Sequence, residues 1–171
     1  MDNKPRNSIY GEGNGSKLGK IQDLLFDPIS GSITGFVVHP GGLFAHAQFL
    51  PVLAVRALGT DAIMVEQGHV LQEITMEPVL SGSLSVGSLG GLPVLDDAGK
   101  VLGKMTDAVL AENALSVEAL QYSSGVLDSM LHGKTTVPLA IVKAIGADSI
   151  VVPASYHAPT EKPEATETTQ A

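Results

Sequence analysis

PVLAVRALGTDAIMV, at residues 51–65, occurs a second time in this chain as PLAIVKAIGADSIVV at residues 138–152. The two copies share Pro, Val, Ala, Gly, Asp, Ile and Val at matching positions, and several other positions exchange similar residues. A second motif, LGKxxD, precedes each copy, at residues 18–23 and 102–107. Because an internal repeat defines the folding unit, the sequence predicts two copies of one small unit.

Short apolar runs separated by turn-forming residues make up both units. Residues 17–26 and 32–39 flank the turn DPISG, and residues 92–95 and 101–110 flank the turn DDAG. Pro, Gly, Asp and Ser supply the backbone angles of tight turns, so each pair of runs predicts an antiparallel hairpin. Residues 43–50 are expected to form a further short strand.

The predicted fold is all-β, with two small, strongly curved β-barrels in tandem. We expect the first barrel at residues 9–76 and the second at residues 92–153, with the Ser- and Gly-rich linker 77–91 between them. Apolar residues in the linker indicate that it packs against another part of the chain. Residues 157–171 carry acidic residues and no large apolar side chain, so this tail is expected to be disordered.

Each repeated stretch is expected to contain one short helical turn followed by a strand. Pro51 suits the first position of a helix, and the apolar residues after it follow a helical period for two turns at most. Gly59, and Gly146 in the second copy, are expected to end the helical turn with a positive φ.

The recurring residues resemble the PRC-barrel domain family. The resemblance rests on LGKIQDLLFDPISGSITGFVV and LPVLAVRALGTDAIMV in the first unit, and on PVLDDAGKVLGKMTDAVL and VPLAIVKAIGADSIVV in the second. The family includes the cytoplasmic domain of the photosynthetic reaction centre H subunit and the C-terminal barrel of a ribosome maturation factor. The resemblance implies two tandem PRC-type barrels. Its motifs are hydrophobic and structural, so they imply no particular activity.

The composition argues against several classes of function. The chain has no cysteine, which removes disulfides and thiolate chemistry, and its net charge of −8 comes without a basic stripe for nucleic acid. No apolar run reaches the ~20 residues of a membrane helix, and no secretory signal is visible among the first residues. We therefore expect a cytoplasmic protein that neither inserts into membranes nor binds nucleic acid directly.

Motifs for catalysis and ligand binding are incomplete. GEGNGSK and HGKTT lack the residue order or the context of a phosphate-binding loop, and the histidines show no metal-ligand spacing. Lys20 with Asp23, and Lys104 with Asp107, recur in register, and we interpret them as surface pairs that mark the fold. We expect no catalytic residue, no cofactor and no metal.

The resemblance and the incomplete motifs favour a non-enzymatic protein–protein interaction or assembly module with a protein partner of unknown identity. A ribosome- or RNA-associated maturation factor that acts through contacts with ribosomal protein is the alternative. An enzyme or ligand sensor that uses the groove between the barrels, and a homo-oligomer, also stay open.

The two units differ most after residue 125, where the second has VLDSMLHGKTT and the first has GLFAHAQFL. A longer connection with apolar side chains beside charged ones suits a partner-binding loop within residues 124–136. Its candidate residues are Leu127, Asp128, Met130, Leu131, His132 and Lys134. The alternative is a loop that folds these side chains onto its own barrel or the other one.

Overall fold

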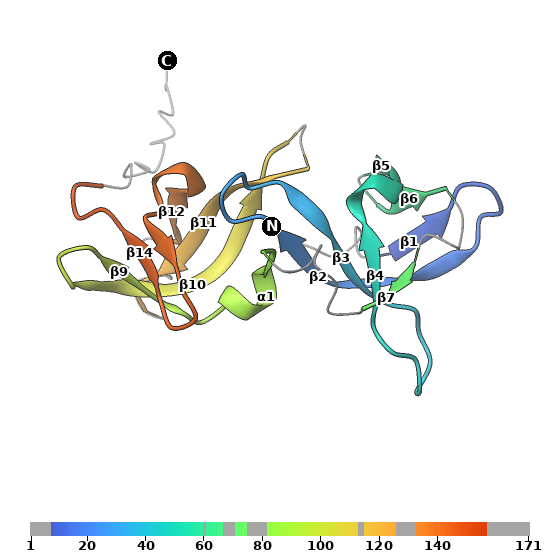
Figure 1. The fold of residues 1–171 in the computed structure, drawn as a ribbon, viewed down its shortest axis with the longest axis horizontal. Coiled ribbons are helices and arrows are strands. Elements are labelled where there is room, and N and C mark those ends of the chain that lie inside the picture. Colours follow the sequence, from blue (N-terminus) through green and yellow to red (C-terminus); the bar gives the residue numbers. More distant parts are fainter. Residues whose placement is uncertain are drawn as a thin grey trace, which may run out of the picture.

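The computed structural model describes residues 8–59, 61–66, 71–74, 82–112, 115–125 and 133–156. In these residues the protein is all-β, as predicted: two curled sheets lie side by side, and the only α-helix among them is one turn long (Figure 1). The candidate loop residues 126–132 and the tail 157–171 lie outside the described residues.

The first sheet contains eight strands. They are β1 (Ser8–Gly11), β2 (Lys17–Phe26), β3 (Ile33–His39), β4 (Gln48–Pro51), β5 (Val55–Leu58), β6 (Ile63–Val65), β7 (Gln72–Glu73) and β8 (Leu84–Ser85). Their order is β5-β6-β1-β2-β3-β4-β7, and β8 pairs with β2 outside this path. All neighbours are antiparallel except β1 and β6, which are parallel.

The second sheet contains six strands. They are β9 (Pro93–Asp96), β10 (Val101–Leu110), β11 (Val117–Ser123), β12 (Thr135–Pro138), β13 (Ala144–Ile145) and β14 (Ile150–Val152). Their order is β12-β11-β10-β9-β14-β13, which matches β4-β3-β2-β1-β6-β5 in the first sheet. The equivalent pair β9 and β14 is again parallel. Both hairpins predicted from the turns DPISG and DDAG are present.

Alternating apolar residues place one face of each sheet in a core, because neighbouring side chains of a strand point to opposite faces. The buried core of the first sheet comprises Ile9, Ile33, Phe36, Val38, Leu50, Ile63 and Val65. The core of the second comprises Leu89, Val94, Met105, Val117, Leu120, Val137, Leu139, Ile150 and Val152, together with Phe26 from the first sheet. The two cores therefore share strand β2.

Each repeated stretch contains one short helical turn, as predicted, but the prediction for the two glycines is wrong. The turns are single 3-10 turns, η1 (Val52–Ala54) and η3 (Leu139–Ile141). The chain then returns to a strand before Gly59 and Gly146, and neither glycine has a positive φ. Each glycine instead donates its N–H across a tight turn, Gly59 to the carbonyl of Ala62 and Gly146 to that of Ser149, both at 2.9 Å.

The described part of the linker packs against both sheets, as its apolar residues predicted. Leu84 and Ser85 of β8 pair with the end of β2, and α1 (Val86–Leu89) follows directly. The hydroxyl oxygen of Ser85 caps α1 by accepting the N–H of Ser88. Leu89 is buried in the second core. The linker is therefore an ordered part of the fold at residues 82–91.

Candidate functional site

The two sheets meet through equivalent residues. β2 aligns with β10 from Lys17 with Val101 to Phe26 with Leu110, and the same alignment places Ser32 opposite Ser116. These two serines form an antiparallel bridge with each other. On either side, Ile33 donates its N–H to Leu115 at 2.9 Å and Val117 donates to Gly31 at 2.7 Å. The junction therefore has local pseudo-twofold symmetry.

Asp27 fixes the turn that carries one side of this junction. Its carboxylate accepts the N–H of Ile29 at 2.8 Å and the hydroxyl of Ser30 at 3.1 Å. The backbone hydrogen bond from Ile29 is the main reason that the pKa of Asp27 lies below its ordinary value. The turn therefore presents Gly31 and Ser32 to the second sheet in a fixed conformation.

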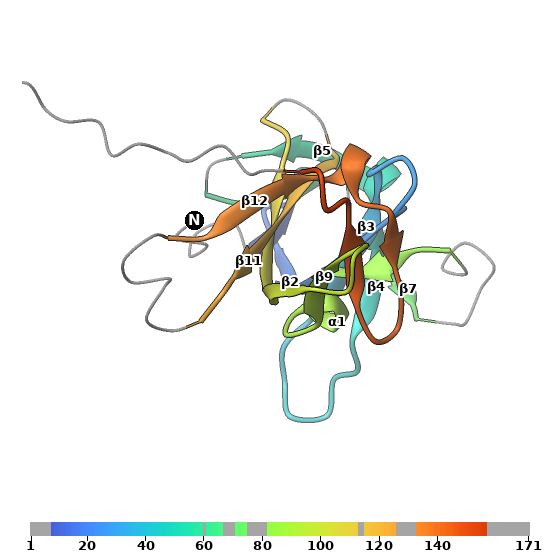
Figure 2. The same cartoon turned by 90° about the vertical axis from the view of Figure 1, so that its left-hand side faces the viewer.

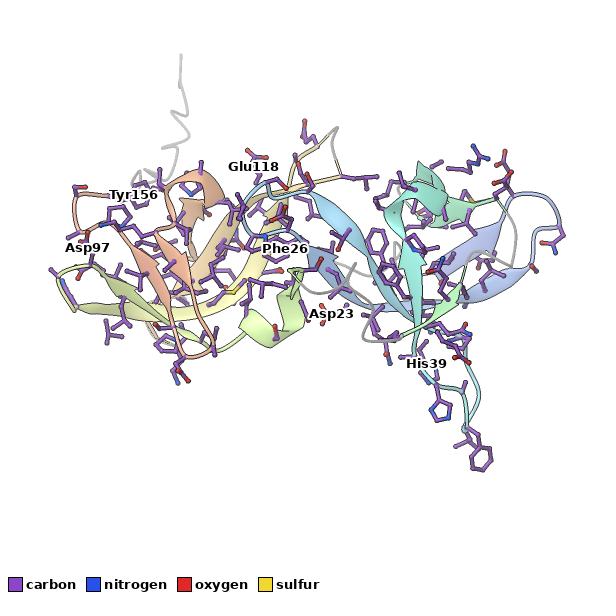
Figure 3. All side chains as sticks on the ribbon, in the orientation of Figure 1. Asp23, Phe26, His39, Asp97, Glu118 and Tyr156 are labelled. Carbon is purple, nitrogen blue, oxygen red and sulfur yellow. The ribbon has the colours of Figure 1, made fainter. Side chains whose placement is uncertain are left out.

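Each long strand also sends its last residue toward the core of the other sheet. Phe26 is 0% exposed and packs in the second core (Figure 3). Its equivalent, Leu110, packs against the first core as well as the second, and it is only half-buried. Phe26 and Leu110 therefore occupy equivalent positions, but Phe26 is fully buried and Leu110 is not. Leu110 lies beside a groove.

A groove of about 510 Å³ opens between the two sheets beside Leu110. The second sheet contributes Asp107, Ala108 and Leu110, which are followed at the rim by Ala111 and Glu112. The first sheet contributes mainly apolar side chains, and α1 forms one wall; these lining residues are Ile21, Gln22, Asp23, Leu24, Phe36, Leu58, Ile63, Val86 and Gly87. This volume falls within the range of small-molecule and peptide sites.

Asp23 and Asp107 both border the groove, but they have different partners. The carboxylate of Asp23 accepts the hydroxyl of Ser85, the N–H of Gly87 at 3.0 Å and the N–H of Leu24 at 2.8 Å. Asp107 accepts the N–H of Ala108 at 2.8 Å. Neither aspartate pairs with its predicted lysine: the two ion pairs among the described residues join other groups. Asp23 therefore holds the linker, a role that the local LGKxxD motif does not reveal.

A second exposed feature is the 40–47 loop between β3 and β4, which projects away from both sheets (Figures 1 and 2). Leu43 is 98% and Phe44 92% exposed. A strand was predicted over residues 43–50, but β4 begins only at Gln48, so the prediction is wrong for Leu43 and Phe44. Gly41 and Gly42 have positive φ, which turns the chain outward before the two apolar residues.

The base of the 40–47 loop is also hollowed. A depression of about 430 Å³ is lined by Pro40, Ala45, His46, Ala47, Gln48, Glu73 and Ile74. His39 accepts the N–H of Gly41 through Nδ1 at 3.1 Å and so braces the start of the loop. Among the described residues, no group of three or more His, Cys, Asp or Glu side chains is placed to hold a metal ion.

Most of the candidate residues in the predicted partner-binding loop of the second unit lie outside the described residues. Of its six candidate residues only Lys134 is described, and it is exposed. The structure therefore does not test that prediction. It places apolar side chains instead on the equivalent loop of the first unit, where the sequence GLFAHAQFL already showed Leu43 and Phe44 after two glycines.

Two small curled sheets with 3-10 turns and mainly antiparallel strands define a small-barrel class of all-β protein. Comparison with known families is more specific: the family model described as the PRC-barrel domain matches residues 6–72. The chain therefore contains a PRC-barrel domain over these residues. No curated protein matches the chain. In the part of the chain that the structure describes, no helix has the length and apolar character to cross a membrane.

Proposed function

We propose that the chain is a non-enzymatic protein-interaction or assembly module built from two PRC-type barrels. The second barrel is inferred from three features that it shares with the first: the repeated stretches, the matching strand order, and a 3-10 turn at the same place in each copy. Bulges in β2 and β10 also fall at equivalent positions, at Ile21/Asp23 and at Met105/Asp107.

The 40–47 loop is the observation that carries the interaction role. Exposing a Leu and a Phe side chain to water forgoes about 1.5–3 kcal/mol of hydrophobic stabilisation for each. Neighbouring exposed aliphatic and aromatic residues on a projecting loop are typical of anchors that enter a partner's pocket. The depression at the base of the loop, with the half-exposed Ile74, extends this apolar surface.

Affinity capture with the full chain tests this proposal. The wild-type chain and a Leu43→Ser, Phe44→Ser variant serve as baits in a lysate of the source cells. Because both side chains are almost fully exposed, the variant should keep its melting temperature. It should lose its partner, since two buried apolar anchors together correspond to an affinity change of about 100-fold or more.

An Ile29→Ser, Leu53→Ser variant is the matched control, because these side chains are 95% and 94% exposed on other turns. It should capture the partner as well as wild type does. If the Leu43→Ser, Phe44→Ser variant captures the partner as well as wild type does, the proposal is refuted. Turnover of a small molecule without any captured partner would also refute it. Recovery of ribosomal proteins as the captured partners would favour the maturation-factor alternative.

A further inference from the structure

One edge of β2 is covered by β8 near the end of the strand, whereas the equivalent edge of β10 has no described strand beside it. We call these two places the filled slot and the open slot. At the end of β2, β8 pairs antiparallel with the strand, so that Ser85 lies opposite Leu25 and Leu84 opposite Phe26. The equivalent residues at the end of β10 are Val109 and Leu110. No described strand pairs with them on the side away from β11. The groove is lined by Leu110 and Asp107, the equivalents of Phe26, which pairs with β8, and of Asp23, which binds Ser85.

We propose that this open slot binds a segment of a partner protein whose sequence resembles Leu-Ser-Val-Gly, the chain's own segment at residues 84–87, in which the first two residues are extended and the last two begin a helical turn. The inference rests on the proposed interaction function and names a binding site for it. An extended segment can add to an unpaired strand edge through backbone hydrogen bonds, while the pockets along the edge select its side chains. Here the filled slot shows which side chains fit.

Three features of the filled slot define the partner's chemistry. Leu84 and Val86 pack against the second core, so the partner should carry apolar residues on either side of its Ser or Thr. Ser85 donates its hydroxyl to Asp23, which calls for Ser or Thr. A Cβ on Gly87 would lie 2.6 Å from Oδ2 of Asp23, so a larger residue would displace the carboxylate that accepts its N–H, which calls for glycine at this position.

The open slot offers the same chemistry with more room. Asp107 occupies the position of Asp23 and accepts only one N–H, that of Ala108, among the described residues. Ala108 and Leu110 replace the larger Leu24 and Phe26, and this difference in volume leaves space on the β10 side. Phe36, Leu58 and Ile63 supply the apolar wall, and Asp107 with Glu112 favours donor groups over anions.

A partner protein fits the slot better than a second copy of the chain. In another copy, Leu84 and Val86 are already packed in the second core and Ser85 is already bound to Asp23. Releasing that segment would break its pairing with β2 and expose apolar surface. A separate protein with an unpaired segment has no such cost.

Binding of a labelled acetyl-SLSVGS-amide peptide to the full chain tests the inference. Fluorescence anisotropy should show saturable binding. Asp107→Ala should weaken it by about tenfold or more, because a hydrogen bond to a carboxylate is lost. A peptide with alanine in place of its middle serine, SLAVGS, should be weakened similarly. Asp97→Ala, on another part of the second sheet, is the matched control and should bind like wild type.

Ala108→Trp provides a variant that does not depend on Asp107. Its side chain is larger than Leu24, the equivalent residue beside the filled slot, so it should fill the groove and abolish binding. Ala108 lines the groove, so the variant should keep its melting temperature. Absence of binding to wild type, or binding by Asp107→Ala and Ala108→Trp that equals wild type, would overturn the inference. Sedimentation showing a dimer that Ala108→Trp dissociates would assign the slot to a second copy and overturn it too. None of these outcomes affects the affinity capture with the Leu43→Ser, Phe44→Ser variant, which tests the proposed function separately.

Discussion

The end of β2 and the end of β10 occupy equivalent positions in two similar sheets, yet only the first is covered by another segment. Phe26 is large and pairs with β8, whereas its equivalent Leu110 is smaller and borders a groove, as does Ala108, the smaller equivalent of Leu24. The strand order, the bulges and the junction are the same on both sides. The comparison teaches that a duplicated scaffold can keep its backbone arrangement while a few side chains decide where a surface stays open.

The largest expected difference between the two ends concerns Phe26 and Leu110. Phe26→Ala should lower the free energy of unfolding by about 3–5 kcal/mol, because it empties a fully buried site in the second core. Leu110→Ala should cost clearly less, since Leu110 is half-buried at the groove. Urea denaturation of both variants measures this. Equal losses would mean that the two ends are packed alike.

The two aspartates should also differ. Asp23→Ala removes the acceptor of three hydrogen bonds, two of which hold the linker, while Asp107→Ala removes the acceptor of one. We expect Asp23→Ala to be the more destabilising by about 1–3 kcal/mol. Melting temperatures of the two variants, compared under one condition, would show this. The reverse order would contradict the assignment of Asp23 to the linker.

The two repeated stretches should also differ in how well they tolerate alanine at Gly59 and at Gly146. A Cβ on Gly59 would lie 2.9 Å from the carbonyl oxygen of Ala62, whereas one on Gly146 would lie 3.6 Å from that of Ser149. Gly59→Ala should therefore destabilise by about 1 kcal/mol through crowding. Gly146→Ala should be neutral within about 0.5 kcal/mol or slightly stabilising, because alanine restricts the unfolded chain. Thermal denaturation distinguishes the two results.

The smallest expected effect concerns the basic residue after each 3-10 turn. Arg56 pairs with Glu66 at 2.9 Å, while its equivalent Lys143 pairs with Asp97 at 2.7 Å. The hydrogen bond from Lys143, with one from the N–H of Ala154, lowers the pKa of Asp97 from its ordinary value of 3.8. The ionised pair therefore stabilises the fold above that value and loses this contribution as the pH falls toward the lowered pKa.

The melting temperature of Asp97→Asn should therefore fall slightly less between pH 6 and pH 3 than that of wild type. Melting temperatures at pH 3 and pH 6 measure the slope. Since both side chains of the pair are largely solvated, the variant should differ little from wild type at pH 6. An unchanged slope at acid pH would show that the pair does not form in solution.

Much of the fold could be predicted from the repeated motifs. The runs at residues 17–26 and 101–110, with their flanking turns, predicted the hairpins because turn residues and apolar patterning act locally. The helical interpretation of residues 52–58 was wrong beyond one turn, because pairing of β5 with β6 overrides a weak local period. The positive φ expected of Gly59 and Gly146 failed for the same reason.

The candidate sites were harder to predict, because they depend on contacts between distant segments. Asp23 meets Ser85 only after the linker folds back onto β2. The exposure of Phe44 depends on β4 beginning at Gln48, which leaves the preceding apolar residues without a partner strand. A signal for the open groove was present, since the aligned motifs LGKIQDLLF and LGKMTDAVL show Leu24 and Phe26 replaced by smaller residues in the second copy.

Backbone hydrogen exchange tests most directly the claim that one architecture carries one filled and one open slot. The outer edge of β2 is paired with β8 at Leu25 and Phe26, while no described strand pairs with the equivalent edge of β10 at Val109 and Leu110, and Leu110 lines the groove. We predict that exchange at the β2 end is slower than at the β10 end by at least about tenfold, because only the former must break a strand pair to exchange. Equal protection at the two ends would contradict the account.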